Sequence, residues 1–248
     1  MSRLARFFVA STTSTMDEAR RLSAGRERGV VSAGTQSAGR GRLAGRTWVD
    51  EPGASLLATF WLPAADYSGA PPSLVAGLLV LEAVRAWVAS AGARLGPEPR
   101  LKWPNDLLVG GRKLAGVLCE SSGGLVYAGV GVNCGQLAFQ PGLRTEPTSL
   151  RLETGLAPAP EALLDALAEA IADRSAFASG WKARYEAAMA WRGEPVEFRP
   201  GLDGEPILGT LVGVDATGAA LIAPDDVRRA PAAGSATAYA SGELRRRY

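Results

Sequence analysis

The fold is decided by the stretch KWPNDLLVGGRKLAGVLCESSGGLVYAGVGVN, which spans residues 102–133. Short apolar runs alternate in it with turn-forming groups: Pro104-Asn105-Asp106, Gly110-Gly111 and Gly123-Gly124. Such groups favour tight turns, and a Gly-Gly pair suits the primed turn of a hairpin. The stretch therefore predicts strands over 101–103, 107–109, 113–120 and 125–132, with a hairpin at Gly110-Gly111.

The residues before this stretch alternate between predicted strands and helices. Thr15 and Glu18 are spaced as a capping box, which predicts a helix from there to about Ser23. A mostly apolar run predicts a second helix over 73–90 that packs on a sheet. The remaining segments are a loop over 34–48, rich in glycine and arginine, and strands over 7–9, 30–33 and 55–61.

The residues after the stretch divide into a helical part and a β part. Apolar residues with a helical period predict helix between 160 and 189. From Pro195 onward, short β-prone pieces are split by glycine-containing pairs, which indicates a small β-barrel. We therefore expect two domains, 1–190 and 191–248. The first is α+β, with a mixed, largely antiparallel sheet flanked by helices.

Composition limits the chemistry that this chain of 248 residues can perform. The absence of histidine excludes Ser-His-Asp and Cys-His nucleophiles, HExxH zinc proteases and most zinc sites. The net charge of +2 gives no general attraction to nucleic acid. An enzyme with this composition relies on Arg, Lys, Asp, Glu and backbone amides, with or without a bound metal.

The cysteines and the hydropathy pattern predict a location. Cys119 and Cys134 form no CxxC pair, and two thiols in a chain this long are typical of a reduced, cytosolic protein. Arg3 and Arg6 interrupt the N-terminal apolar residues, unlike in a secretory peptide. The longest apolar run stops at Glu82, far short of a membrane span. We expect a cytoplasmic protein with no membrane attachment.

The loop GRGRLAGRTW, residues 39–48, is the first candidate site. Glycines let backbone amides turn toward an anion, and arginines add forked donors suited to phosphate or carboxylate. No acidic residue lies between 34 and 48 to neutralise them. This glycine–arginine loop therefore predicts small-anion binding. A solvated basic loop and an RNA-binding arginine–glycine segment are the alternatives.

Two further candidates lie in the first hairpins. The turn 102–106 presents a lysine suited to phosphate and an Asn/Asp pair suited to a hydrated magnesium ion; alternatively it is simply a good turn with Trp103 in the core. Lys113 lies on the opposite face from Leu114, and Gly116 leaves room for a ligand beside the sheet. An edge lysine that limits aggregation is the alternative there.

The fourth candidate is the end of the last strand. Gly129 and Gly131 are two residues apart, so they strip side chains from a single face of that strand. Asn133 then ends the strand with donors and an acceptor. The pattern suits the floor of a site for a ligand with a flat ring. A glycine-lined packing contact within the protein is the alternative.

Together and in this order, these features resemble the biotin–protein ligases, which attach biotin to carboxylase carrier domains. The resemblance covers nearly the whole chain. It implies the class II synthetase-like fold of biotin and lipoate ligases plus the C-terminal barrel, in the monofunctional type without a DNA-binding domain. The matching residues are Ser14-Thr15, Gln36, the glycine–arginine loop, the Lys-Trp-Pro-Asn-Asp turn, Arg-Lys-Leu-Ala-Gly, Gly-Val-Gly-Val-Asn and Thr148-Ser149-Leu150.

The resemblance implies an ATP-dependent, AMP-forming reaction. The biotin carboxylate attacks the α-phosphate of ATP, and pyrophosphate leaves. A lysine of a biotin carboxyl carrier protein, of acetyl-CoA carboxylase or a related carboxylase, then attacks the biotinyl-5′-adenylate. Both steps need mainly alignment and charge neutralisation. The implied ligands are biotin, ATP and Mg²⁺, the implied partner is the carrier, and a homodimer stays open.

The resemblance also implies roles for residues. The catalytic positions are Lys113, Arg40 and Arg42. The biotin-binding positions are Ser14, Thr15, Gln36, Gly39, Arg40, Gly41, Arg42, Lys113, Gly116 and Gly131. The ATP-binding positions are Arg46, Trp48, Lys102, Asn105 and Asn133. No protein ligand to a metal is implied, because magnesium enters the argument only through the triphosphate.

The sequence departs from the family pattern in two places. The glycine–arginine loop is one residue longer at Leu43-Ala44, which bears on Arg46, and Met16 stands where the family commonly has Asn. Ser14 lies too near the first residue for a preceding helix-turn-helix domain, so we expect no direct DNA binding. A lipoate–protein ligase is the alternative enzyme, and an RNA-binding module is the alternative without enzymatic activity.

Overall fold

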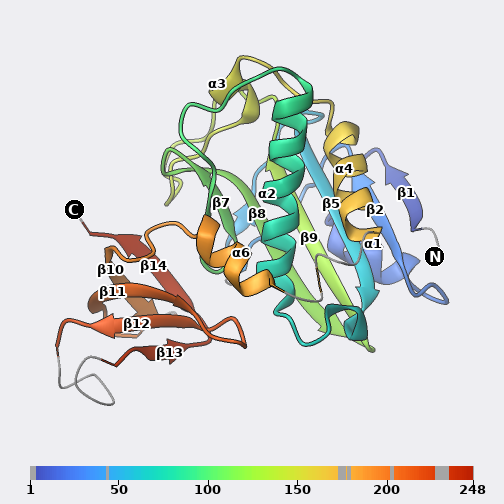
Figure 1. Ribbon diagram of the computed structural model, residues 1–248. Helices are drawn as coiled ribbons and strands as arrows, with labels where there is room; N and C mark the ends of the chain where they lie inside the picture. Colours follow the sequence, from blue (N-terminus) through green and yellow to red (C-terminus); the bar gives the residue numbers. More distant parts are fainter. Residues whose placement is uncertain are drawn as a thin grey trace.

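The computed structural model describes residues 4–42, 45–172, 177, 180–201, 204–226 and 235–247. Most of them surround a seven-stranded sheet (Figure 1). β1 and β2 pair in parallel, and the other neighbouring strands pair antiparallel, which confirms the expected mixed sheet. Its order is β1 (Ala5–Val9), β2 (Gly29–Ala33), β5 (Ser55–Pro63), β9 (Leu125–Asn133), β8 (Arg112–Ser122), β7 (Asp106–Val109) and β6 (Arg100–Lys102).

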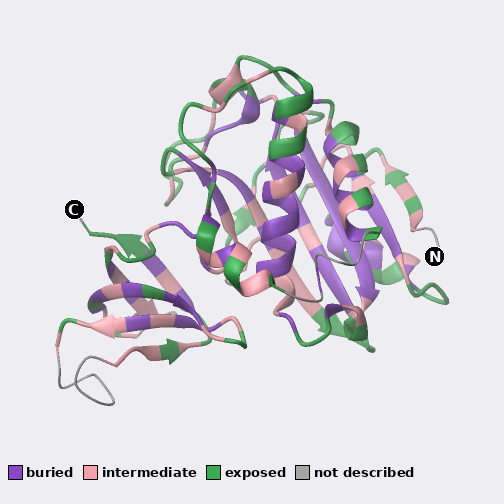
Figure 2. Cartoon of the chain, in the orientation of Figure 1, coloured by how far each residue is buried: buried purple, intermediate pink, exposed green. Residues whose placement is uncertain are grey.

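Helices cover both faces of this sheet (Figure 1). α2 (Pro72–Ser90) and α4 (Pro160–Ala172) pack together on one face, and α1 (Thr15–Leu22) lies on the other. Figure 2 shows buried residues along α2 and the central strands. By length and composition α2 could cross a membrane, but 61% of its most apolar window is buried inside the molecule. α2 is therefore placed as a core helix.

The last part of the chain forms a second sheet of five antiparallel strands. Its order is β13 (Thr237–Tyr239), β12 (Ala220–Pro224), β11 (Ile207–Val214), β10 (Pro195–Pro200) and β14 (Gly242–Arg246). The prediction of a closed barrel is wrong, because β13 and β14 are opposite edges that do not pair with each other in the described residues. The sheet curls enough to bring the Tyr239 and Phe198 ring centroids within 4.6 Å, but β13 is too short to close it.

The two sheets share an apolar core. Trp103 Nε1 donates a hydrogen bond to the Gly218 carbonyl oxygen at 2.9 Å, and the Trp103 ring lies 6.1 Å from the Phe198 ring. Both rings are buried. Trp103 therefore packs in the core, which is one of the two interpretations of the 102–106 turn. Its contacts connect that turn to the second sheet.

The start of α1 differs from its prediction. Ser14, not Thr15, is the N-cap, and Ser14 Oγ accepts a hydrogen bond from the Met16 backbone amide at 3.3 Å. The capping box predicted at Thr15 and Glu18 is therefore wrong, because the N-cap is one residue earlier, at Ser14. The reason is that the Thr15 hydroxyl is used in a contact with Gln36, described below.

Two other predicted segments also differ. The helix expected over 160–189 is not continuous, because α6 (Trp181–Ala188) begins after Gly180, whose φ of +78° is left-handed. The loop over 34–48 contains a short hairpin of β3 (Gly39–Arg40) and β4 (Thr47–Trp48). Leu43-Ala44, where the extra residue is expected, lies outside the described residues. The described residues also form the short helices η1 (Ala64–Tyr67) and α3 (Leu150–Thr154).

Candidate active site

A cavity of about 150 Å³ lies on the α1 face of the large sheet. Its floor is formed by Gly129 and Gly131 of β9 and Gly116 of β8. A Cβ added at Gly131 would lie 2.7 Å from the Trp48 ring, and one at Gly116 would lie 3.2 Å from it. The glycines therefore let the Trp48 indole rest on the strands, so the floor serves both as a packing contact and as a cavity wall.

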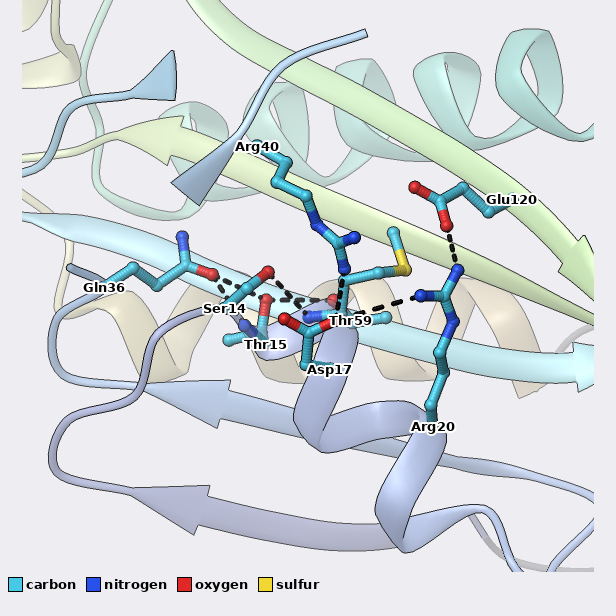
Figure 3. A network of polar contacts seen from close by, with 9 residues as sticks. Ser14, Thr15, Asp17, Arg20, Gln36, Arg40, Thr59 and Glu120 are labelled. Carbon is cyan, nitrogen blue, oxygen red and sulfur yellow. Dashed lines mark hydrogen bonds and ion pairs between the residues drawn. The ribbon is translucent and has the colours of Figure 1, made fainter. Parts of the chain in front are cut away.

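Polar groups from α1, from β5 and from the segment after β2 meet at one end of this cavity, called the smaller cavity from here on (Figure 3). Gln36 Oε1 accepts hydrogen bonds from the Thr15 amide at 2.7 Å and from Thr15 Oγ1 at 3.0 Å. Thr59 Oγ1, which is fully buried, donates to Thr15 Oγ1 at 2.9 Å. A backbone amide can only donate, so Thr15 fixes the carbonyl end of Gln36 against α1. Gln36 lines this cavity together with the buried Ser14, and its Nε2 group is a potential donor.

The glycine–arginine loop is anchored to α1 at one point. Arg40 Nη2 lies 2.6 Å from Asp17 Oδ1 (Figure 3). Arg40 and Gly41 line the smaller cavity, whereas Gly39 is not part of its lining. A Cβ at Gly39 would meet the Trp48 carbonyl oxygen at 2.8 Å, so this position of the hairpin has no room for a side chain.

The same loop is anchored to β14 at two points. Arg42 Nη2 donates to the Gly242 carbonyl oxygen at 2.8 Å, and Arg46 pairs with Glu243. Arg144 Nη1 reaches the other oxygen of Glu243 at 2.5 Å. The Glu243 side chain is only 13% exposed, so one largely buried carboxylate pairs with two arginines.

Lys113 reaches the smaller cavity because β8 contains a bulge. The pairing of β7 with β8 shifts between Leu107 and Leu108, so that Leu114 is one residue too many in β8. Strict alternation would place Lys113 and Gly116, three residues apart, on opposite faces. The bulge places both on the cavity face and leaves Leu114 fully buried in the opposite core.

Lys113 forms an ion pair with the acidic residue of the 102–106 turn. Lys113 Nζ lies 2.6 Å from Asp106 Oδ1 and 5.6 Å from the centre of the Trp48 ring. The Lys113 and Asp106 side chains are 28% and 14% exposed. Asn105 Nδ2 donates to the Val117 carbonyl oxygen at 2.9 Å. The Asn105–Asp106 pair, expected to suit hydrated magnesium, is thus engaged with groups of the protein.

A larger cavity of about 960 Å³ opens beside the first. Lys102 Nζ, in its wall, lies 3.4 Å from Thr145 Oγ1 and 5.6 Å from the centre of the Trp191 ring. Burial lowers the pKa of Lys102, and the nearby Asp106 carboxylate opposes that shift. Both cavities are lined by Arg42, Arg46, Thr47, Trp48, Asn105, Asp106 and Lys113.

Asn133 closes one side of the larger cavity. Its Nδ2 donates to the Thr148 carbonyl oxygen at 2.9 Å, and its Oδ1 accepts from Gln136 Nε2 at 3.4 Å. Asn133 is buried, and its amide is used to fix the segment that follows β9. The segment 146–148 also pairs with the Lys113 backbone, so Asn133 supports the strand that carries Lys113.

The structure brings the sequence-predicted residues to one place. Apart from Gly39, all of them line the smaller or the larger cavity. Sequence reasoning missed Asp17, Thr59, Arg144 and Glu243. Thr59 had a signal, because it is a polar residue inside an otherwise apolar strand. The other three had none, because each acts on residues that are distant in sequence.

Comparisons with known proteins agree with one another. The profile of the Biotin/lipoate A/B protein ligase family matches residues 6–136. The chain is 36% identical over 241 residues to the biotin–[acetyl-CoA-carboxylase] ligase of Paracoccus denitrificans, covering 86% of this chain and 92% of that protein. It is also 40% identical over 106 residues to the bifunctional ligase/repressor BirA of Escherichia coli, covering 40% of this chain and 30% of that protein.

A solved structure has the same architecture. The biotin protein ligase from Aquifex aeolicus, in complex with biotin and ATP, matches with a TM-score of 0.78 at 25% identity. The match covers 98% of this chain and 99% of that chain. The fold likeness therefore includes the C-terminal sheet as well as the large one.

Proposed function

This chain belongs to the Biotin/lipoate A/B protein ligase family, and from that premise we propose that it is a biotin–protein ligase. It activates biotin with ATP to biotinyl-5′-adenylate and transfers biotin to a lysine of a biotin carboxyl carrier protein. The Paracoccus relative is named as a biotin–[acetyl-CoA-carboxylase] ligase, and the Aquifex structure is a complex with biotin and ATP.

One observation carries the proposal: two cavities of unequal size meet at Lys113. The smaller has a polar end and a glycine floor, which suits a compact ring that carries a hydrogen-bond acceptor. The larger has more basic than acidic residues in its lining, with Arg42, Lys102 and Lys113 among the basic ones, which suits a nucleoside triphosphate. A carboxylate from the first and an α-phosphate from the second would meet beside the Lys113 ammonium and Arg42.

In the first step, a biotin carboxylate oxygen bonds to the α-phosphorus. The bond from that phosphorus to the bridging oxygen breaks, and pyrophosphate leaves with the electron pair. Two anions must approach each other, which costs about 4 kcal/mol per pair of unit charges at 4 Å in a surface-like dielectric. Lys113, Arg40 and Arg42 supply the opposing charge.

In the second step, the carrier lysine attacks the acyl carbon. Its amine nitrogen forms the amide bond, the carbon–oxygen bond to phosphate breaks, and AMP leaves with that electron pair. The amine proton is lost to solvent or to the departing phosphate. Lys113 and Arg42 again lie beside the phosphate that takes up the charge.

The remaining site residues divide between the two ligands. Ser14, Thr15, Gln36 and the glycines at 39, 41, 116 and 131 form the biotin end. For ATP we propose Lys102, Asn105 and Arg46 at the phosphates, with Trp48 and Asn133 around the nucleoside. Among the described residues, no group of three or more His, Cys, Asp or Glu could hold a metal ion. Magnesium would therefore enter with the ATP phosphates as part of the substrate.

We extend the proposal to partners and location. The protein partner is a carboxyl carrier domain, and we propose cytoplasmic action without direct DNA contact. The net charge of +2 supports the absence of a DNA-binding field. We also propose that 1–190 and 191–248 act as two domains, because each region has its own sheet.

The test is exchange of labelled pyrophosphate into ATP, with biotin and lipoate as parallel substrates. Exchange with biotin alone is the expected result, since it reports the first step without the carrier. Exchange with lipoate alone would mean that the protein performs the same adenylation reaction on lipoate instead of biotin. Exchange with neither, on folded protein with magnesium, would overturn the proposed function.

A further inference from the structure

Four charged side chains form a continuous chain from β8 across α1 to Arg40 of the glycine–arginine loop (Figure 3). Glu120 of β8 pairs with Arg20 of α1. Arg20 Nη1 lies 3.8 Å from Asp17 Oδ1, and Asp17 Oδ1 lies 2.6 Å from Arg40 Nη2. The sheet thus fixes Arg20, Arg20 orients Asp17, and Asp17 holds the glycine–arginine loop.

The position of Asp17 differs from that of the other loop anchors. Arg42 and Arg46 are held by β14, beside the larger cavity. In the described part of the chain, Asp17 is the one side chain whose ion pair holds the loop on the biotin side. The loop has glycines at 39, 41 and 45, which allow several backbone conformations, and Trp48 packs on the glycine floor only at the far end of the loop, so the ion pair at Arg40 adds a contact at the near end.

From this geometry we propose that Asp17 is a positioning residue for Arg40. It keeps the loop closed over the biotin end of the cavity and so retains biotin and its adenylate. A guanidinium has five N–H donors, and Asp17 engages one nitrogen of Arg40, so the others remain for a ligand. This inference rests on the proposed function and adds the ion pair that holds the loop.

The pair is weak enough to open when biotin enters. Asp17 is 53% exposed and Arg40 is 37% exposed, so solvent screens the attraction. For exposed ion pairs of this kind, loss of one partner changes an equilibrium roughly two- to fivefold. Asp17→Asn should therefore shift the loop toward the open state by that factor, without abolishing the reaction.

The first experiment tests the holding contact itself, without ligands. Trypsin cleavage after Arg40, followed by mass spectrometry, should be roughly two- to fivefold faster in Asp17→Asn than in the unaltered protein, because Asp17 pairs with the Arg40 side chain that trypsin must bind. Glu18→Gln is the matched control, because Glu18 is also an acid in the first turn of α1 but pairs with Arg21. Equal cleavage rates in Asp17→Asn and the unaltered protein, or equal acceleration by Glu18→Gln, would overturn the proposal.

The second experiment tests the consequence for catalysis. Asp17→Asn should raise the KM for biotin and the release rate of biotinyl-adenylate roughly two- to fivefold, and should leave the KM for ATP unchanged. The difference from the unaltered protein should shrink as salt rises, and Asp17→Glu should restore part of the retention. In an Arg40→Gln background, Asp17→Asn should have no further effect.

The outcomes separate the two proposals. A lower KM for biotin in Asp17→Asn would mean that Asp17 competes with the substrate for Arg40, and it would overturn the positioning role. A full effect of Asp17→Asn in the Arg40→Gln background would overturn it too. If the unaltered protein makes no adenylate, the proposed function fails, and the cleavage rates still decide whether Asp17 holds the loop.

Discussion

Lys113 and Asp106 show how one ion pair can set both the chemistry and the stability of the site. Lys113 Nζ is held 2.6 Å from a carboxylate that is only 14% exposed, at the junction of the two cavities. When two substrate anions arrive, the ammonium is already in place and need not be reoriented. Without its lysine, Asp106 would be left as a poorly solvated charge.

Lys113→Ala should therefore abolish pyrophosphate exchange, with a loss of at least about a hundredfold. It should also lower the free energy of unfolding, because Asp106 loses its partner. The double variant Lys113→Ala with Asp106→Asn should recover much of that stability and none of the activity. Near-normal exchange in either variant would remove Lys113 from the mechanism.

Lys102 gives the site a dependence on alkaline pH. Burial lowers its pKa, so its ammonium loses the proton at a lower pH than an ordinary lysine does. The charge offered to the ATP phosphates is complete below the folded pKa and is lost as pH rises through it. The KM for ATP should therefore rise with pH earlier than for a solvated lysine.

The measurement is the KM for ATP from neutral to alkaline pH, with Lys102→Arg for comparison. Arginine stays protonated throughout that range, so the alkaline rise should be absent in this variant. A rise that is the same in both proteins would belong to another group. Burial of charged Lys102 also lowers the free energy of unfolding. This loss of stability is complete below the folded pKa, and it declines as pH rises above that pKa and folded Lys102 becomes neutral.

At the scale of elements, the sequence predicts the strands well and their irregularities poorly. Alternation and Gly-Gly turns are local, so the hairpins of β7, β8 and β9 could be predicted from their own residues. The bulge at Leu114 could not, because it depends on how β8 pairs with β7. The N-cap of α1 was displaced for a similar reason, since Gln36, 21 residues away, takes the Thr15 hydroxyl.

The candidate site shows the same division. Motifs within one segment, such as the glycine–arginine loop and the end of β9, could be assigned from sequence and do line the cavities. Groups that act across segments, such as Asp17 on Arg40 and Glu243 on Arg46, could not. Their partners are chosen by the packing of elements, which no local pattern encodes.

The contact between β4 and β9 can be tested by adding one methyl group. Gly131→Ala would place a Cβ 2.7 Å from the Trp48 ring, and the ring must shift with the loop that carries it. Biotin affinity should fall roughly tenfold, the usual cost of overpacking a close contact. Gly135→Ala is the matched control, because its nearest neighbours would lie 3.7 Å away, and its binding should not change. Titration calorimetry with biotin measures both, and unchanged affinity in Gly131→Ala would contradict the packing argument.

At the scale of the whole molecule, the small sheet completes the larger cavity. Gly242 and Glu243 of β14 hold arginines that come from the other sheet's loops. Removing residues 191–248 would also uncover Trp103, whose indole packs on Phe198. Loss of activity after such a deletion would mix two causes, so a single change in β14 separates them better.

Glu243→Gln should raise the KM for ATP about tenfold, because Arg46 and Arg144 lose a charged partner that aligns them. The KM for biotin should stay the same, since Asp17 still anchors the other side of the loop. Asp225→Asn, which removes an exposed pair with Arg247 elsewhere on the small sheet, serves as control. A lower KM for ATP in Glu243→Gln would mean that Glu243 competes with the phosphates.

The anchors between the loop and β14 also have a consequence for the order of folding. Arg42 and Gly242 are 200 residues apart in the chain, and Arg46 and Glu243 are 197 apart. Contacts between such distant residues are slow to form, because the entropy cost of closing a long loop comes before the contacts stabilise the chain. The hairpins of the large sheet join near neighbours and should form first. During refolding, the circular dichroism of the sheet should therefore return before the capacity to bind ATP, and the protein should acquire its structure before it becomes an enzyme.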